Sequence, residues 1–263
     1  MHDFTLQVLI SCMHQTDHSI ISKSNIQSDA IVINQCDKNL IEEYSFKNKT
    51  GKECHVKFIS TTERGLSRSR NMAIRNATAD ICLICDDDEV LDDNYPAKII
   101  EAFTINSRAS ILTFHLHYYQ QKYYPPKEIN VGYLQALKIA SWQIAFKRCD
   151  ITENFILFDE DFGSGVSKAG GEEVMFLYSC LRNKLKIRYV PINIGKLHEG
   201  ESQWFHGFTE EYFFDRGIFT RKLLGRALAI LYGGYFLLKK RPLYINDISL
   251  KKASNALYKG LFK

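Results

Sequence analysis

Acidic side chains directly follow an apolar run in the first half of the chain. Residues Ile81–Cys85 are all apolar, and Asp86–Glu89 are all acidic. Continuous apolar runs of this length are typical of strands buried in parallel sheets. Carboxylates clustered at the end of a strand repel one another unless a cation lies among them, and their hard oxygen atoms suit Mg²⁺ or Mn²⁺. The pattern therefore predicts a divalent ion that holds substrate phosphates, with a solvated turn and helix N-cap as the simpler alternative.

The segments around this cluster predict an α/β fold with a mostly parallel sheet flanked by helices. Strands alternate with helices, and ligands of such sheets bind beyond the carboxyl ends of the strands. The predicted strands are 6–11, 30–34, 56–60, 81–85, 111–119, 141–147 and 187–190, the last stopped by Pro191. The predicted helices are 65–76, 96–106 and 172–184.

Basic residues are concentrated near the C-terminus. The 263 residues include 34 Lys/Arg and 30 Asp/Glu, a net charge of +4. Residues 216–263 hold eleven of the basic residues and a single acid, Asp247, which leaves 23 basic and 29 acidic residues in 1–215. We therefore expect an acidic α/β domain over 1–215 and a basic, partly apolar helical tail over 216–263 that is attracted to anionic surfaces.

The cysteines and the apolar runs favour a cytoplasmic protein. Seven cysteines, several within predicted strands, suggest free thiols in a reducing compartment rather than a disulfide framework. Met1–Thr5 lacks the basic start of a signal peptide. No apolar run approaches the roughly 20 residues of a membrane-spanning helix.

Several short motifs stand in one order along the chain. They are Gly65–Asn71 (Gly-Leu-Ser-Arg-Ser-Arg-Asn), the acidic Asp86–Glu89, Phe158–Gly165, Gly170–Phe176 and a lone His198. Together they resemble glycosyltransferase family 2, the inverting nucleotide-sugar transferases with the GT-A fold. The resemblance is strongest to members that build bacterial capsule, O-antigen and other surface polysaccharides. It implies transfer of a sugar from a nucleotide-sugar donor to a saccharide or lipid-linked saccharide acceptor.

The resemblance implies a metal and donor site in the acidic cluster. Asp86-Asp87-Asp88 matches the family's D-x-D motif, which holds Mn²⁺ or Mg²⁺ and the donor, with Asp86 nearer the ribose and Asp88 nearer the metal. A divalent ion there neutralises the diphosphate leaving group as a Lewis acid. His198 matches the C-terminal histidine that approaches the metal or the diphosphate. A plain surface histidine is the alternative.

The resemblance also implies the general base. Glu172-Glu173 matches an acid pair, usually Glu-Asp, that opens a helix and deprotonates the acceptor hydroxyl. Consecutive helical residues point about 100° apart, so only one of them faces the cleft squarely. By position Glu173 is the first choice and Glu172 the second. The second Glu departs from the family pattern, and stabilisation of a helix N-terminus is the alternative role.

Four further residues are expected near the donor nucleotide. Arg70 and Asn71 match the family's Arg-Asn step, which lies near the nucleotide. Many members carry Asp-Asp-Gly-Ser after the second strand, where an Asp reads uracil, but this chain has Asn34–Asp37. Base recognition would then fall to Gln35, since an amide both donates and accepts hydrogen bonds where a carboxylate only accepts, and Asp37 is placed among the donor-binding residues. UDP is favoured, with GDP, dTDP and CMP left open.

The acceptor is expected beside aromatic and acidic residues. The acceptor side is assigned to Asp159, Phe162 and Gly163 of the motif at 158–165, together with Trp142. An aromatic face stacks on a sugar ring, although core packing is an equal alternative for Trp142.

The tail contains a segment suited to a membrane surface. Ala227–Leu238 is twelve uncharged, mostly apolar residues with basic residues on both sides. It is too short to cross a bilayer, but it suits a helix that lies among anionic headgroups. Because acceptors in surface-polysaccharide assembly are typically lipid-linked and presented at the inner leaflet, we expect a peripheral protein there. Packing of the helix on the body is the alternative.

Two other functional classes use parts of this pattern. A metal-dependent phosphohydrolase or nucleotidyltransferase would need the clustered carboxylates but leaves Gly170–Phe176 and the tail unexplained. A non-catalytic nucleotide-sugar-binding module would bind donor without turnover, which the intact Glu172-Glu173 pair argues against. Nucleic-acid binding is disfavoured because the predicted cleft is acidic and the basic residues cluster near an apolar helix.

Overall fold

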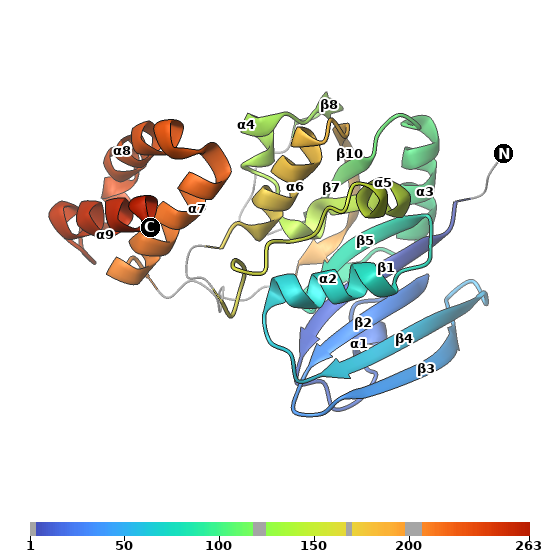
Figure 1. Cartoon of the computed structure of the whole chain (residues 1–263). Coiled ribbons are helices and arrows are strands. Elements are labelled where there is room, and N and C mark those ends of the chain that lie inside the picture. The colour runs from blue at the N-terminus through green and yellow to red at the C-terminus, as the bar shows by residue number, and fades with distance from the viewer. Residues whose placement is uncertain (1–3, 118–124, 167–169, 198–206) are drawn as a thin grey trace. The chain divides into compact units, whose positions relative to one another are not determined.

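The computed structural model describes residues 4–117, 125–166, 170–197 and 207–263. Figure 1 shows the course of the chain. The chain forms two compact units, the first made of residues 1–158 and 176–200 and the second of residues 159–175 and 201–263. The first unit contains the sheet, and the second contains the C-terminal helices. The predicted His198 lies outside the described residues.

The first unit is built on a mixed, largely parallel sheet. Its strands are β1 (Leu6–Met13), β2 (Asp29–Gln35), β3 (Leu40–Lys47), β4 (Glu53–Thr61), β5 (Ile81–Asp86), β6 (Glu89–Leu91), β7 (Ile111–His117), β8 (Ile129–Asn130), β9 (Ile144–Lys147) and β10 (Ile187–Leu197). Their order is β3-β4-β2-β1-β5-β9-β7-β10-β6, with β8 also on β10. Strands β4, β2, β1 and β5 run parallel, which confirms the predicted fold class.

Helices cover both faces of this sheet. They are α1 (Ile20–Lys23), α2 (Leu66–Asn76), α3 (Tyr95–Ile105), α4 (Tyr133–Ala136), α5 (Arg148–Glu153) and α6 (Glu172–Arg182), and a 3₁₀ turn spans Ser141–Gln143. Alternate residues of β1 point to opposite faces, so Val8 and Ile10 join the core cluster that includes residues of α1 and α3. Ser11 points the other way and accepts a 2.8 Å hydrogen bond from Ser69 of α2. Helix α2 therefore lies on the opposite face, across β1 and β2 (Figure 1).

Several elements differ from the sequence-based expectation. Pro191 does not end β10, because the register on β7 shifts between Tyr189 and Asn193 and an irregular stretch tolerates a residue without an N–H. The strand predicted over 141–147 begins only at Ile144, after the 3₁₀ turn. Strand β3 was not predicted. Among the strands that the structure describes, β3 pairs with β4 alone, at the sheet edge, and it carries exposed Glu and Lys among its apolar residues.

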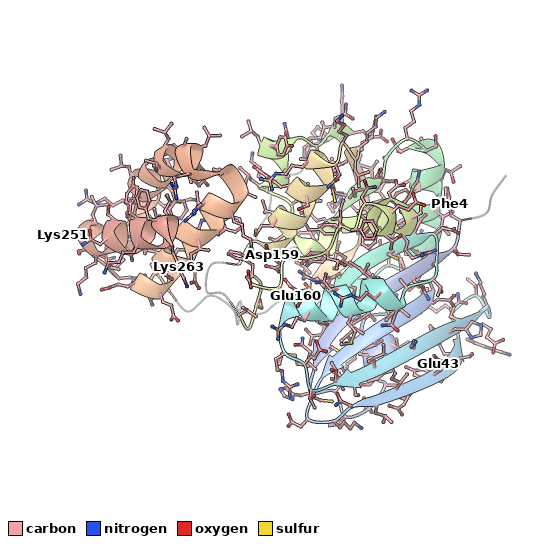
Figure 2. All side chains as sticks on the ribbon, viewed as in Figure 1. Phe4, Glu43, Asp159, Glu160, Lys251 and Lys263 are labelled. Atoms are coloured by element: carbon pink, nitrogen blue, oxygen red, sulfur yellow. The ribbon has the colours of Figure 1, made fainter. Side chains whose placement is uncertain are left out.

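The second unit is a group of helices with its own core. The helices are α7 (Glu210–Leu224), α8 (Arg226–Tyr244) and α9 (Leu250–Phe262), and Lys251 and Lys263 mark the two ends of α9 in Figure 2. Phe213, Phe236 and Tyr244 are buried at its centre. The predicted apolar helix of the tail is thus confirmed and extended at its C-terminal end. Of the helices that the structure describes, none has the length and apolar character needed to span a bilayer.

Candidate donor site and acid pair

The carboxyl ends of β1, β2 and β5 meet at one edge of the sheet. The strand register aligns Asp86 with Ser11 and Gln35 with Met13. The parallel pairing therefore brings Gln35 and the acidic cluster, far apart in the sequence, to one edge of the sheet. This is the edge at which ligands of open α/β sheets bind.

Asp86 is fixed in place by two side chains. Nη2 of Arg70 donates to both carboxylate oxygens of Asp86 at 2.9 Å, and the Ser141 hydroxyl donates to Oδ2 at 3.1 Å. The Arg70 side chain is only 2% exposed, and its guanidinium lies 5.4 Å from the centre of the Phe158 ring. Arg70 is buried because it lies on the face of α2 that packs on the sheet. Its observed contacts are with Asp86 and Phe158, so it orients the first acid of the cluster.

The next two acids form an exposed turn between β5 and β6. Asp87 and Asp88 are both exposed. Partial loss of water around Asp87 and the neighbouring Asp86 carboxylate raise the pKa of Asp87 above its usual value. Negative charge is therefore concentrated at the tip of the turn, where a cation would relieve it.

Glu89 differs from the other acids because it is buried. Its side chain is 1% exposed, and its Oε1 accepts a 2.8 Å hydrogen bond from the backbone N–H of Asp86. Burial, together with the charges of Asp86 and Asp88, raises the pKa of Glu89 well above its usual value. Glu89 thus supports the backbone of the turn from inside, and its burial favours the protonated, neutral form.

The chemistry of the turn fits a divalent ion bound together with a substrate. Asp86, Asp87 and Asp88 are consecutive carboxylates at one strand end, and loss of water together with the Asp86 charge raises the pKa of Asp87. Mg²⁺ is usually held by one or two carboxylates, with phosphates and water as the remaining ligands. Within 4–117, 125–166, 170–197 and 207–263, no group of three His, Cys, Asp or Glu side chains is arranged to hold an ion by itself. The residues present fit an ion whose other ligands come from a donor diphosphate.

The remaining predicted donor residues, Gln35, Asp37 and Asn71, form hydrogen bonds or ion pairs with neighbouring loops. The Asn71 amide donates to the backbone oxygen of Phe158 at 2.9 Å and accepts from its N–H at 2.8 Å. Oε1 of the buried Gln35 accepts the N–H of Gly65 at 2.7 Å. Asp37 forms a 2.6 Å ion pair with Arg64. These contacts place Gln35 and Asp37 near the start of α2, and they give Asn71 a positioning role.

Two residues that contact the predicted site residues could not be predicted from the sequence. Ser141 contacts Asp86 from 55 positions away, and no motif marks it. Arg64 also donates to the backbone oxygen of Cys36 at 2.8 Å, so it joins the loops after β2 and β4. The adjacent motif at Gly65–Asn71 was the only available signal for Arg64.

The predicted acid pair opens α6. Glu172 is buried at 6% exposure, whereas Glu173 is half-buried. Gly170 and Gly171 precede the pair with φ of 58° and 97°, a backbone conformation that favours glycine and turns the chain into the helix. The greater exposure of Glu173 suits the residue that was ranked first as general base.

The predicted acceptor residues are divided between the two units. Trp142 belongs to the first unit, where it is partly buried against the sheet core. Asp159, Phe162 and Gly163 belong to the second unit. There Asp159 pairs with Lys222 at 2.6 Å, and the buried Phe162 meets the Phe219 ring edge-on, with ring centres 5.9 Å apart. Phe162 is therefore a packing residue, and Asp159 is held by a lysine of α7.

Comparisons with known proteins identify the family and the fold of the chain. The model of glycosyl transferase family 2 matches residues 11–167. The chain resembles S. aureus TarS 1–349 in complex with UDP-GlcNAc, with a TM-score of 0.65 and 14% identity over 97% of this chain and 80% of that one. It also resembles a mannosyltransferase from Pyrobaculum calidifontis in complex with GDP-Man and Mn²⁺, with a TM-score of 0.54 and 12% identity over 98% and 75% of the two chains. No curated protein matches the sequence significantly.

The family match covers more than half of the chain and includes the acidic cluster. The chain therefore belongs to glycosyltransferase family 2 and is a nucleotide-sugar glycosyltransferase with a GT-A-like fold.

Proposed function

We propose that the protein is an inverting glycosyltransferase whose donor binds at the acidic turn after β5. The observation that carries the proposal is the fixed Asp86, held by Arg70 and Ser141 next to the exposed Asp87 and Asp88. The Asp86 carboxylate, oriented in this way, would accept hydrogen bonds from the hydroxyl groups of a donor ribose. The nearby Gln35 would contact the base and Asp37 would belong to the donor-binding residues, with UDP as the favoured nucleotide.

Mn²⁺ or Mg²⁺ would be held by Asp88 and Asp86, with His198 as a further ligand. When bound, the ion would neutralise charge on the leaving nucleoside diphosphate. Both ions favour the carboxylate and phosphate oxygens that such a complex offers.

The transfer itself requires a base from this chain. Glu173, with Glu172 as second choice, would take the proton of the acceptor hydroxyl as its oxygen attacks the anomeric carbon. The bond from that carbon to the diphosphate breaks on the opposite side, so the configuration inverts and the nucleoside diphosphate leaves. Trp142, Asp159, Phe162 and Gly163 belong to the acceptor side in this proposal. The packed Phe162 and the lysine-bound Asp159 would shape that side rather than stack on the sugar.

We place the acceptor in bacterial surface-polysaccharide assembly, as a saccharide or lipid-linked saccharide of capsule or O-antigen type. The outer face of α8 supports a membrane setting. Leu228, Leu231, Tyr235 and Leu238 recur at helical spacing along this face, with exposures of 60%, 72%, 59% and 67%. We call this set the α8 stripe. Exposed apolar surface of this kind marks a contact site.

Charge favours an anionic bilayer over a second copy of the chain as the occupant of the α8 stripe. Basic residues stand at both ends of the stripe, Arg226 before it and Lys239–Arg241 after it. In a two-fold pair of α8 helices, basic residues would face basic residues whether the helices ran parallel or antiparallel. Anionic headgroups instead attract both ends while the stripe enters the boundary with the acyl chains. The protein would then work at the cytoplasmic face of the plasma membrane, with residues 216–263 as its membrane-contacting part.

Donor binding is the first test. A panel of UDP-, GDP-, dTDP- and CMP-sugars is measured by ligand-observed NMR with and without Mn²⁺. We expect metal-dependent binding of one nucleotide class, lost in Asp88→Ala and kept in Glu43→Gln, an exposed acid on β3 (Figure 2). Binding to none of the panel would contradict a donor site at Asp86–Asp88.

The base is tested by turnover of the bound donor. We expect Glu173→Gln to lower kcat on the order of a thousandfold while donor binding is kept, because only the proton acceptor is removed. Glu172→Gln serves as the matched variant. Full activity of both variants would contradict a catalytic role for the pair.

Membrane contact is tested with vesicles in a sedimentation assay. We expect the protein to bind vesicles of phosphatidylglycerol and phosphatidylethanolamine and to bind pure phosphatidylcholine weakly. The double variant Leu231→Ser/Leu238→Ser should lose binding, whereas Leu134→Ser, exposed at 75% on α4, should not. Self-association that the double variant abolishes, without vesicle binding by the parent, would show that the stripe contacts a second copy instead.

A further inference from the structure

Helix α7 contacts the segment that leads into the acid pair. The segment comprises residues 159–175 and belongs to the same compact unit as α7. Phe219 of α7 is buried at 2% exposure, and its ring lies beneath the backbone of Gly171. A Cβ atom on Gly171 would come within 2.6 Å of the Phe219 ring, so only glycine fits here without displacing it. Gly171, directly before Glu172, thus packs against α7.

A second contact lies at the start of the same segment. Nζ of Lys222 is 2.6 Å from a carboxylate oxygen of Asp159 and 3.1 Å from one of Asp161, and it lies 5.2 Å from the centre of the Phe162 ring. The Asp159 side chain is only 24% exposed, whereas Asp161 is 82% exposed. The Asp159 pair is therefore the better shielded of the two. Partial burial alone would lower the pKa of Lys222, but the hydrogen bonds to both acids outweigh it and raise that pKa.

The two contacts lie one turn apart on α7. Residues 219 and 222 are neighbours on a helical face because they are three positions apart. Phe162 touches both, as the edge-on partner of Phe219 and beneath the Lys222 ammonium group. One face of α7 therefore holds the acid-pair segment near both of its ends, at 159–162 and at 171. In the sequence, Lys222 is one of the basic residues that precede Ala227–Leu238.

We propose that Phe219 and Lys222 are positioning residues for the acid pair Glu172-Glu173, a role that rests on the proposed function of that pair. A general base must lie within hydrogen-bond reach of the acceptor hydroxyl, and misplacement by about 1 Å costs on the order of a hundredfold in rate. The helical unit would then position the base for the chemical step in addition to contacting the membrane.

The test compares Lys222→Gln with Lys222→Arg in the full chain. Lys259→Gln is the matched control, because it removes one exposed positive charge from α9 of the same unit. We expect Lys222→Gln to speed hydrogen exchange in peptides from 159–175 and to lower kcat about tenfold, with the donor KM within about twofold of the parent. Lys222→Arg keeps the charge and should restore most of both, and Lys259→Gln should change neither. Phe219→Leu, which keeps an apolar side chain, should show the same pattern as Lys222→Gln.

The two readouts separate the positioning role from the proposed function. Unchanged exchange in 159–175 in both Lys222→Gln and Phe219→Leu would overturn the role, whatever the activity. Faster exchange with unchanged kcat, in a protein whose transfer is abolished by Glu173→Gln, would also overturn it and leave the proposed function intact. If the parent protein shows no sugar transfer with any donor, the proposed function fails, and the positioning role that rests on it fails with it.

Discussion

The candidate donor site, at the carboxyl ends of β1, β2 and β5, and the helical unit are stabilised by different kinds of contact. At the carboxyl ends of the strands, buried polar side chains make specific hydrogen bonds: Arg70 binds the Asp86 carboxylate, Asn71 the backbone of Phe158, and Gln35 the backbone N–H of Gly65. In the helical unit, aromatic and aliphatic side chains form the core, and glycines let α7 and α9 approach closely. Polar networks of this kind fix precise positions but fail when one partner is removed. Close packing of side chains and backbone does not tolerate added volume.

We expect the largest loss of stability when Arg70 of the donor site is replaced. Replacing Arg70 with Ala leaves the Asp86 carboxylate, 23% exposed, without its main partner and opens a cavity beside Phe158. Removal of one member of a buried ion pair typically costs about 3–5 kcal/mol, and the residual exposure of Asp86 points to about 3 kcal/mol. The free energy of unfolding from urea titration measures this loss. Arg68→Ala, on the exposed face of the same helix, should change it by less than about 0.5 kcal/mol. Equal effects of the two substitutions would contradict the role of Arg70 as a buried partner.

A smaller loss is expected where α7 crosses α9. A Cβ atom on Gly260 would overlap the backbone oxygen of Phe214, and one on Gly217 would overlap that of Leu257. Gly260→Ala should therefore push the helices apart and cost about 1–3 kcal/mol in the stability of the helical unit, as overpacking does. Thermal unfolding followed by circular dichroism reports the change.

Gly234 of α8 is the matched control for Gly260. A Cβ atom there would meet only the Tyr258 hydroxyl, at an ordinary distance of 3.6 Å. Gly234→Ala should be neutral or stabilising by up to about 1 kcal/mol, because alanine is the better helix former. Destabilisation by Gly234→Ala equal to that by Gly260→Ala would show that the close crossing is not the cause.

Much of the sheet could be predicted because burial on both faces leaves a clear pattern. The segment Ile81–Cys85 is continuous and apolar, and it became β5 with Asp86 at its end. Strand β3 was missed because an edge strand with one solvated face mixes charged and apolar residues. The end of β10 was misplaced because a proline signals a stop, whereas an irregular pairing accommodates it.

Less of the site could be predicted, because its contacts are tertiary. The acidic cluster itself was located from its position after a strand. A surface arginine and a buried one look alike in a sequence, so the link from Arg70 to Asp86 could not be foreseen. The same holds for Lys222, which lies 63 positions from Asp159. Glu89 was read as one more acid of the cluster, although its burial sets it apart.

We expect the smallest and most specific effect at Glu89, in the pH dependence of the free energy of unfolding. Its pKa in the folded protein is raised well above its usual value. The folded state therefore keeps a proton that the unfolded state releases above its own pKa of about 4.3. The free energy of unfolding should fall as pH rises from that value toward the folded pKa. Glu89→Gln has no such proton to lose, so it should flatten this fall and be more stable than the parent at pH 8.

Urea titrations at pH 5 and pH 8 measure this difference. In Glu89→Gln the carbonyl oxygen of the new amide still accepts the Asp86 N–H, so the turn and the donor affinity should be kept. The raised pKa of Asp87 has the same sign and should leave a residual slope in the variant. Glu43→Gln, on exposed β3, should leave the slope as in the parent. An unchanged slope in Glu89→Gln would mean that Glu89 is ionised in the folded protein. The acidic turn would then carry one more negative charge than its burial indicates, and a bound cation would be needed to hold it in place.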